Sequence, residues 1–123
     1  MNSRLVTITI DCADSGKLAD FWTAVFGCDE REEDREGTYI AKSDGGPAMF
    51  FQRVPEEKVV KNRVHVDLRP PTTMREEIDR LVVLGAKEVR RVERDEFYWT
   101  IMQDPEGNEF CILRCDSERG VTS

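Results

Sequence analysis

The residues of this sequence best suited to chemistry are one histidine, one cysteine and two carboxylates on two predicted strands. His65 is the only histidine, and its imidazole could act as a base, donate a hydrogen bond to a ligand or bind a metal ion. Cys111 could be a thiolate ligand, or a nucleophile with His65 as its base. Glu109 could be a general base, and Asp67 lies two residues after His65. We therefore predict catalytic roles for His65, Glu109 and Cys111.

Each of these residues also has a structural interpretation, which the sequence leaves open. His65 could be held by Asp67 or by a backbone group, and Cys111 could be a small apolar filler of the core. Glu109 follows a turn, where a solvated carboxylate is equally expected. No pair among the four cysteines has CxxC spacing, so a zinc finger or knuckle is not expected.

Strand alternation predicts which other side chains share a face with this group. In residues 63–69, the three apolar residues Val64, Val66 and Leu68 are expected to face a helix, which leaves His65 and Asp67 on the concave face. The register of strand 48–53 decides which of two neighbouring phenylalanines joins them. The predicted ligand pocket is lined by Thr9, Phe50, Phe51, Asp67 and Trp99.

Hydrophobic periodicity predicts the elements that position these side chains. Helices are expected at 15–26, after Asp14 or Ser15 and before Gly27, and at 74–84, after Thr73 and before Gly85. The charged segments 28–36 and 90–96 are expected to be exposed strand edges. The predicted strands are 5–11, 28–36, 38–42, 48–53, 63–69, 87–94, 97–102 and 109–115.

The two halves of the chain repeat one order of elements: strand, helix and three strands. Ile8-Thr9-Ile10-Asp11 corresponds to Val64-His65-Val66-Asp67, and Val25-Phe26-Gly27 corresponds to Val83-Leu84-Gly85. A unit of this size cannot bury both faces of its sheet alone. We therefore predict one α+β domain of two tandem βαβββ modules, which form a cupped, half-open sheet with the helices outside. Its expected parts are module one (4–54), a linker (55–62), module two (63–115) and a flexible tail (116–123).

This plan resembles the glyoxalase-like branch of the vicinal-oxygen-chelate superfamily, which shares the glyoxalase, bleomycin-resistance and extradiol dioxygenase fold. The segments that carry the resemblance, within residues 4–114, are 61–68 (KNRVHVDL) and 99–111 (WTIMQDPEGNEFC). In metal-using members, the resemblance implies one His or Glu ligand from the first and last strand of each module. By position these ligands fall on His65, Cys111, Thr9 and Phe50, or on Met49 or Phe51 after a one-residue slip.

Composition excludes several classes of protein. The chain has 123 residues, with 18 Lys and Arg against 25 Asp and Glu, giving a net charge of −7. That charge opposes nucleic-acid binding, which needs a basic face. No apolar run has the length of a membrane span, and no secretory signal is visible. We expect a cytoplasmic protein with reduced thiols. Its expected partner is a small molecule, and neither nucleic acid nor a membrane. We also expect the protein to form a homodimer.

Three functions remain open. The favoured hypothesis is a glyoxalase-like, small-molecule-binding protein with a concave, aromatic-lined pocket, a degenerate metal site and no cofactor. The second is a lyase, isomerase or dioxygenase in which a divalent metal acts as a Lewis acid. The third is a metal-free enzyme that uses His65 with Cys111 or Glu109. The sequence alone does not decide whether the protein is an enzyme.

Overall fold

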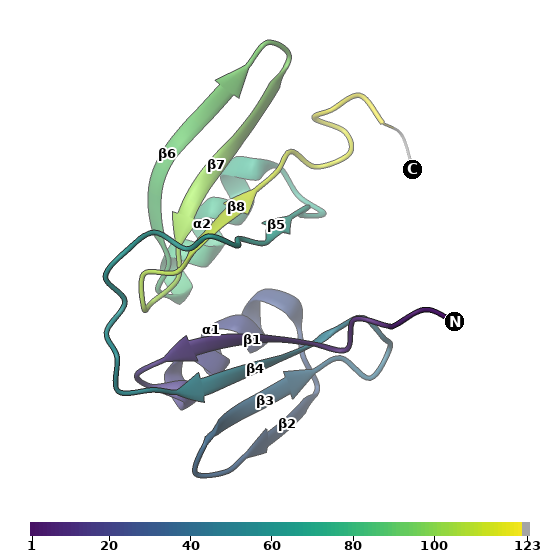
Figure 1. Ribbon diagram of the computed structural model, residues 1–123. Coiled ribbons are helices and arrows are strands. Elements are labelled where there is room, and N and C mark those ends of the chain that lie inside the picture. The colour runs from purple at the N-terminus through teal and green to yellow at the C-terminus, as the bar shows by residue number, and fades with distance from the viewer. Residues whose placement is uncertain (122–123) are drawn as a thin grey trace. The chain divides into compact units, whose positions relative to one another are not determined.

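The computed structural model describes residues 1–121, which form two compact units: unit 1, Met1–Val59, and unit 2, from Val60 onward. Within the described residues, each unit has one helix and one four-stranded mixed sheet (Figure 1). In both sheets the unit's first strand runs parallel to its last strand, and the other pairs are antiparallel. The α+β fold of two tandem βαβββ modules is confirmed, and neither sheet closes on itself.

Unit 1 has the sheet order β1-β4-β3-β2. Asp14 caps its helix by accepting a hydrogen bond from the Lys17 backbone N–H, and Gly27 ends it with a φ of 69°, where glycine is favoured. The helix packs on β3 and β4 and buries Leu18 and Trp22. The elements of unit 1 are β1 (Thr7–Cys12), α1 (Ser15–Phe26), β2 (Glu30–Glu33), β3 (Gly37–Ala41) and β4 (Ala48–Arg53).

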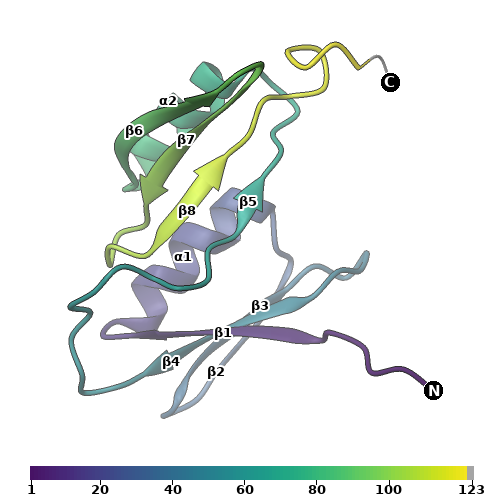
Figure 2. The ribbon, with the colours of Figure 1, turned by 45° about the horizontal axis from the view of Figure 1, so that its top comes forward.

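Unit 2 repeats this plan with the order β5-β8-β7-β6. A capping box between Thr73 and Glu76 starts its helix, and Gly85 ends it. The helix covers one face of the sheet (Figure 2), against β6 and β8. The elements of unit 2 are β5 (Asp67–Leu68), α2 (Met74–Leu84), β6 (Lys87–Arg94), β7 (Phe97–Gln103) and β8 (Glu109–Ile112).

Alternation along β7 and β8 produces the core of unit 2. Thr100, Met102, Phe110 and Ile112 are all buried, and the Thr100 hydroxyl lies 3.3 Å from the Met74 sulfur of α2. These side chains therefore face the helix. The residues between them point to the opposite face of the sheet.

The predicted strand 63–69 is wrong in its first half, since β5 contains only Asp67 and Leu68. Backbone pairing with β8 begins where the Val66 carbonyl accepts from the Cys111 N–H. Before that point, no strand among residues 1–121 pairs with the chain, and Val64 is 77% exposed instead of facing the helix. Side-chain contacts hold this segment, beginning with the Asn62 N–H, which donates to Glu109.

The tail predicted at 116–123 lies partly outside the described residues. Within residues 116–121, the Glu118 carboxylate accepts hydrogen bonds from the Met74 and Cys115 backbone N–H groups. This contact connects the segment to the first turn of α2. Among the residues described, no helix is long and apolar enough to span a membrane.

Candidate functional site

A pocket of about 430 Å³ lies on the face of the unit 2 sheet opposite α2. Strand register explains its composition, because directly paired residues share a face. Ile101 pairs with both Arg90 and Cys111, and Val92 pairs with Trp99. The lining residues are Lys61, His65, Asp67, Arg90, Val92, Arg94, Trp99, Ile101, Glu109, Cys111 and Leu113.

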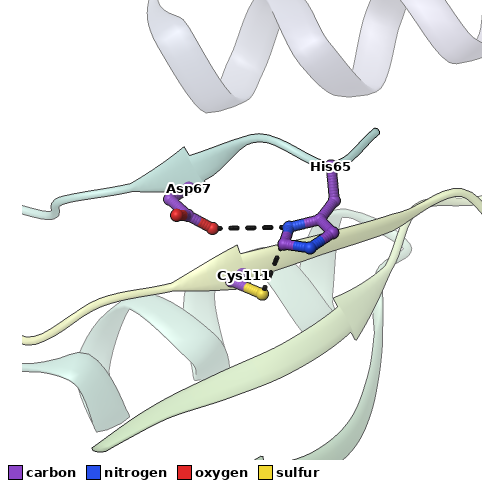
Figure 3. Close-up of side chains that lie close together, drawn as sticks. All are labelled: His65, Asp67 and Cys111. Carbon is purple, nitrogen blue, oxygen red and sulfur yellow. Dashed lines mark hydrogen bonds and ion pairs between the residues drawn. The ribbon is translucent and has the colours of Figure 1, made fainter. Parts of the chain in front are cut away.

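His65 contacts the carboxylate of Asp67 and the thiol of Cys111 (Figure 3), and all three residues line this pocket. Its Nδ1 atom is 3.6 Å from Asp67 Oδ1 and 3.9 Å from Cys111 Sγ. The His65 and Asp67 side chains are 42% and 51% exposed, whereas Cys111 is buried at 5%. The site therefore has two groups that a ligand can reach and one that lies beneath them.

The Cys111 thiol is held in its protonated form. Burial, followed by the negative charge of Asp67, raises its pKa to about 11, with Lys61 acting in the opposite direction. A thiol protonated at neutral pH is a weak nucleophile, although His65 lies beside it. The environment thus opposes the metal-free mechanism in which His65 activates Cys111.

Glu109 is anchored to the segment that leads to His65. Its Oε1 atom accepts from the Asn62 N–H at 3.0 Å, and the Asn62 amide donates to Asn108 Oδ1 at 3.5 Å. Buried Asp104 orders the turn between β7 and β8 by accepting from the backbone N–H and side-chain amide of Asn108. Glu109 therefore helps to position the chain segment that precedes His65, and it also lines the pocket.

The pocket combines an apolar floor with a charged rim. Trp99, Ile101 and Leu113 supply half-buried apolar surface, while three cationic side chains, Lys61, Arg90 and Arg94, join from the linker and β6. The sequence interpretation did not place Arg90 and Arg94 at a pocket because it treated residues 90–96 as a solvated edge, and it placed Lys61 in the linker. Alternation places Arg90, Val92 and Arg94 on one face of β6, and this was visible in the sequence. Which face it is depends on the register of β6 against β7, which shifts between Glu88 and Arg90.

The remaining predicted pocket residues belong to unit 1, whereas the pocket just described is built from unit 2 alone. Thr9 pairs with Phe50, so the two share a face of the unit 1 sheet. Phe51 has the opposite orientation and is 0% exposed in the core of unit 1. The register of β4 therefore directs Phe51 into that core and leaves Phe50 on the face that Thr9 occupies.

A metal ion fits the donors of unit 2 in number and chemistry. One atom each from His65, Asp67 and Cys111 lie within 4.8 Å of one another, and ligands of one Zn²⁺ ion at roughly 2.0–2.3 Å would also be this close. Binding would displace the Cys111 proton. The ligand positions implied in unit 1, Thr9 and Phe50, offer neither imidazole nor carboxylate.

A sequence model of the family described as a glyoxalase-like domain matches residues 7–113. No curated protein matches the chain. The family match spans both βαβββ units and includes every strand that contributes to the pocket.

Solved structures share this fold at low sequence identity. The fosfomycin resistance protein FosX from Listeria monocytogenes is 18% identical with a TM-score of 0.70, over 97% of this chain and 99% of that chain. A variant of FosX is known in complex with Mn(II) and 1S,2S-dihydroxypropylphosphonic acid. The antibiotic binding protein TnmS3 from Streptomyces sp. CB03234 is 16% identical with a TM-score of 0.65, over 91% and 95%.

A third neighbour is a glyoxalase/bleomycin resistance protein/dioxygenase family enzyme from Burkholderia phytofirmans PsJN. It is 20% identical with a TM-score of 0.65, over 89% of this chain and 97% of that chain. At these identities the likeness establishes the fold alone, and the chemistry must be argued from this chain's own residues.

Proposed function

The chain belongs to the glyoxalase-like domain family, and from this premise we propose that it binds a small organic molecule in the unit 2 pocket without catalytic turnover. The observation that carries the proposal is the apolar floor of Trp99, Ile101 and Leu113 within a pocket of about 430 Å³. Apolar walls with a few polar groups are typical of ligand sites. The protonated state of Cys111 favours binding over nucleophilic chemistry.

The neighbours support this proposal by showing what the fold accommodates. TnmS3 is described as an antibiotic binding protein, so binding without a named reaction occurs on this architecture. For the present chain, Trp99 would supply the largest flat apolar surface of the pocket. His65 and Asp67, both accessible, would supply hydrogen bonds that orient the ligand.

The proposal is tested by screening aromatic and amphipathic compounds for binding by calorimetry. Tryptophan fluorescence is a second readout for compounds that do not absorb at the excitation and emission wavelengths of tryptophan. The chain has two tryptophans, and Trp22 is 1% exposed in unit 1. A ligand in the pocket should change the emission of Trp99, and Trp99→Ala should weaken its binding about tenfold or more. Binding that Trp99→Ala leaves unaltered would place the ligand elsewhere and refute the proposal.

A divalent-metal enzyme is the second candidate, favoured by the convergence of His65, Asp67 and Cys111. When bound, a metal would supply a Lewis acid for oxygen atoms of a substrate. His65 and Asp67 would hold it from the accessible side and Cys111 from beneath. Glu109 could then move a proton, since it lines the same pocket.

Metal content separates the two candidates. The protein, purified without a metal-binding tag, would be loaded with Zn²⁺, Mn²⁺, Ni²⁺ or Fe²⁺ and measured by mass spectrometry. The enzyme would be favoured by a content of about one ion per chain that is lost in His65→Ala. The ion should be retained in the control Cys28→Ser, which removes a thiol outside the pocket. Absence of a stoichiometric ion under every loading condition would leave the binding protein as the function.

We also propose that the protein is a cytoplasmic homodimer. No disulfide forms among the described residues, which suits a reducing compartment. Light scattering coupled to size-exclusion chromatography would give twice the chain mass for a dimer, and the single chain mass would refute this part of the proposal.

A further inference from the structure

We propose that the ligand of the unit 2 pocket is an organic anion with a flat apolar body, whose acidic group is bound by Arg90 and Arg94. This inference rests on the proposed function, because it assigns a chemical class to the molecule that the pocket binds.

The placement of the two arginines follows from the pleat of β6. Arg90, Val92 and Arg94 alternate with Arg91 and Glu93, so the first three share the pocket face. Val92 is 5% exposed between them. The two guanidinium groups therefore flank a buried apolar position at the edge of the pocket.

The arginines on the two faces of β6 differ in whether they have a carboxylate partner. On the face opposite the pocket, Arg91 pairs with Glu93 at 3.0 Å and stacks over the Tyr98 ring at 3.9 Å. On the pocket face, Arg94 donates to its neighbour's carbonyl, that of Glu93. Within residues 1–121, neither Arg90 nor Arg94 forms an ion pair with a carboxylate. Their charge is therefore available to a ligand.

The pocket's own carboxylates do not take up this charge. Asp67 lies beside His65, and Glu109 accepts from the Asn62 backbone. Lys61 adds a third cation to the lining, in a chain whose net charge is −7. A cationic rim on an acidic protein would attract anions to this one concave surface.

The floor and the rim together define the ligand. A planar guanidinium binds carboxylate, sulfonate or phosphonate oxygens through two parallel hydrogen bonds. Trp99 and Ile101 lie on the neighbouring strand, opposite Val92 and Arg90, where they would contact the apolar body. A molecule with both parts satisfies the two kinds of surface at once.

Three probes with one body test this inference on the full chain: 2-naphthoate, 2-naphthamide and 2-naphthylmethylammonium. Their dissociation constants would be measured by isothermal titration calorimetry at low and moderate salt. We expect naphthoate to bind about five- to tenfold more tightly than the neutral amide, and the ammonium compound to bind most weakly. The preference should shrink as salt rises. Equal affinity for the acid and the amide would overturn the inference.

Substitutions on the two faces of β6 provide the matched comparison. Arg90→Gln and Arg94→Gln should each weaken naphthoate about three- to tenfold and change naphthamide less than twofold. Arg91→Gln removes the same charge from the same strand on the opposite face, and should leave both affinities within twofold. Equal losses in Arg90→Gln and Arg91→Gln would show a general charge effect and refute the assignment.

The results also separate this inference from the function on which it rests. If naphthamide and naphthoate bind equally and Trp99→Ala weakens both, the pocket binds small molecules but does not select anions. If no probe binds at millimolar concentration, both proposals fail. Circular dichroism of each variant would confirm that the fold is intact.

Discussion

The Nδ1 atom of His65 lies 3.9 Å from the Sγ atom of Cys111, although the residues are 46 positions apart. The parallel pairing of β5 with β8 produces this contact, since it places Asp67 opposite Cys111. The resemblance to glyoxalase-like proteins assigns metal ligands to the same two positions. In this chain the pair combines an accessible imidazole with a buried thiol.

Cys111 should react slowly with alkylating agents at neutral pH, because its pKa is raised to about 11. At pH 8 the thiolate fraction is then on the order of 100-fold below that of an ordinary exposed thiol. Peptide mapping after timed treatment with iodoacetamide would measure the rate at Cys111, with glutathione as the reference. The rate should rise steeply between pH 9 and 11 and should approach that of glutathione in urea.

Asp67→Asn provides the control for the electrostatic part of this shift. It removes the charge that adds to the effect of burial, so the Cys111 pKa should fall and alkylation at pH 9 should accelerate several-fold. Alkylation of the wild-type protein as fast as glutathione at pH 7.5 would show that the thiol is activated. That result would revive the metal-free enzyme with His65 as the base.

The predictions that succeeded depended on local signals. Both helices lie at the expected residues; Asp14, one of the two residues expected before the first helix, and Thr73 are the cap residues, and Gly27 ends its helix with positive φ. The strands at 48–53 and 87–94 have the predicted bounds, because alternation and flanking turns define them without reference to a partner.

What the sequence left open or placed wrongly required knowledge of strand pairing. Val64 alternates with His65 as a strand residue would, yet β8 provides no backbone partner at that point. Phe50 and Phe51 are equally plausible wall residues until pairing with Thr9 and Ile10 fixes the register. Arg90 is an exposed charge on an edge strand, as expected, but its place on the pocket face depends on a shift in register that is not visible in the sequence.

The turn between β7 and β8 should be sensitive to the loss of one carboxylate oxygen. Asp104 is 3% exposed, and its two oxygens accept from Glu106 and Asn108. Asp104→Asn would place an amide donor against one of these donors, so we expect a loss of about 1–3 kcal/mol in the free energy of unfolding. Urea unfolding followed by Trp99 fluorescence would measure it.

Asp95→Asn is the matched control for that substitution. Asp95 lies in the turn between β6 and β7 with a φ of 54°, a conformation that asparagine adopts readily. The same chemical change should therefore alter stability by less than about 0.5 kcal/mol. Equal effects at the two turns would contradict the role assigned to Asp104.

Gly37 should tolerate no side chain, although its backbone does not have a positive φ. A Cβ atom there would lie 2.1 Å from the Phe51 carbonyl oxygen and 2.9 Å from the Phe50 ring. Gly37→Ala must displace backbone of β4, so we expect a loss of about 1–3 kcal/mol or more. Trp22 emission in a Trp99→Phe background would report unfolding of unit 1.

Gly16→Ala should have the opposite sign in the same unit. Gly16 lies in the first turn of α1, and the nearest atoms to an added Cβ are 3.8 Å away. Alanine there reduces the entropy of the unfolded chain and favours the helix, which should add about 0.4–1 kcal/mol. Destabilisation by both substitutions would mean that unit 1 is sensitive to any glycine replacement. The close contact at Gly37 would then not be the cause of the loss in Gly37→Ala.

Loss of the ion pair between Arg75 and Glu88 should make unit 2 less stable in acid. The pair joins α2 to β6 at 2.6 Å, and its hydrogen bonds lower the pKa of Glu88 below its usual value. A depressed carboxyl pKa contributes stability above the unfolded pKa and loses it as pH falls through the folded one. Glu88→Gln should therefore cost about 0.2–1 kcal/mol at pH 7, since the pair is exposed, and progressively less as the pH falls through the folded pKa of Glu88.

A double-mutant cycle isolates this contribution from other acid effects. Arg75 also contacts Asp79 at 3.3 Å, so Arg75→Gln alone removes two interactions. The coupling energy between Arg75→Gln and Glu88→Gln, measured by urea unfolding at pH 7 and at pH 3, reports only their mutual attraction. It should be smaller at pH 3 than at pH 7, because protonation of Glu88 removes the attraction. A coupling energy of equal size at both pH values would mean that packing of the two side chains, and not charge, connects the helix to the strand.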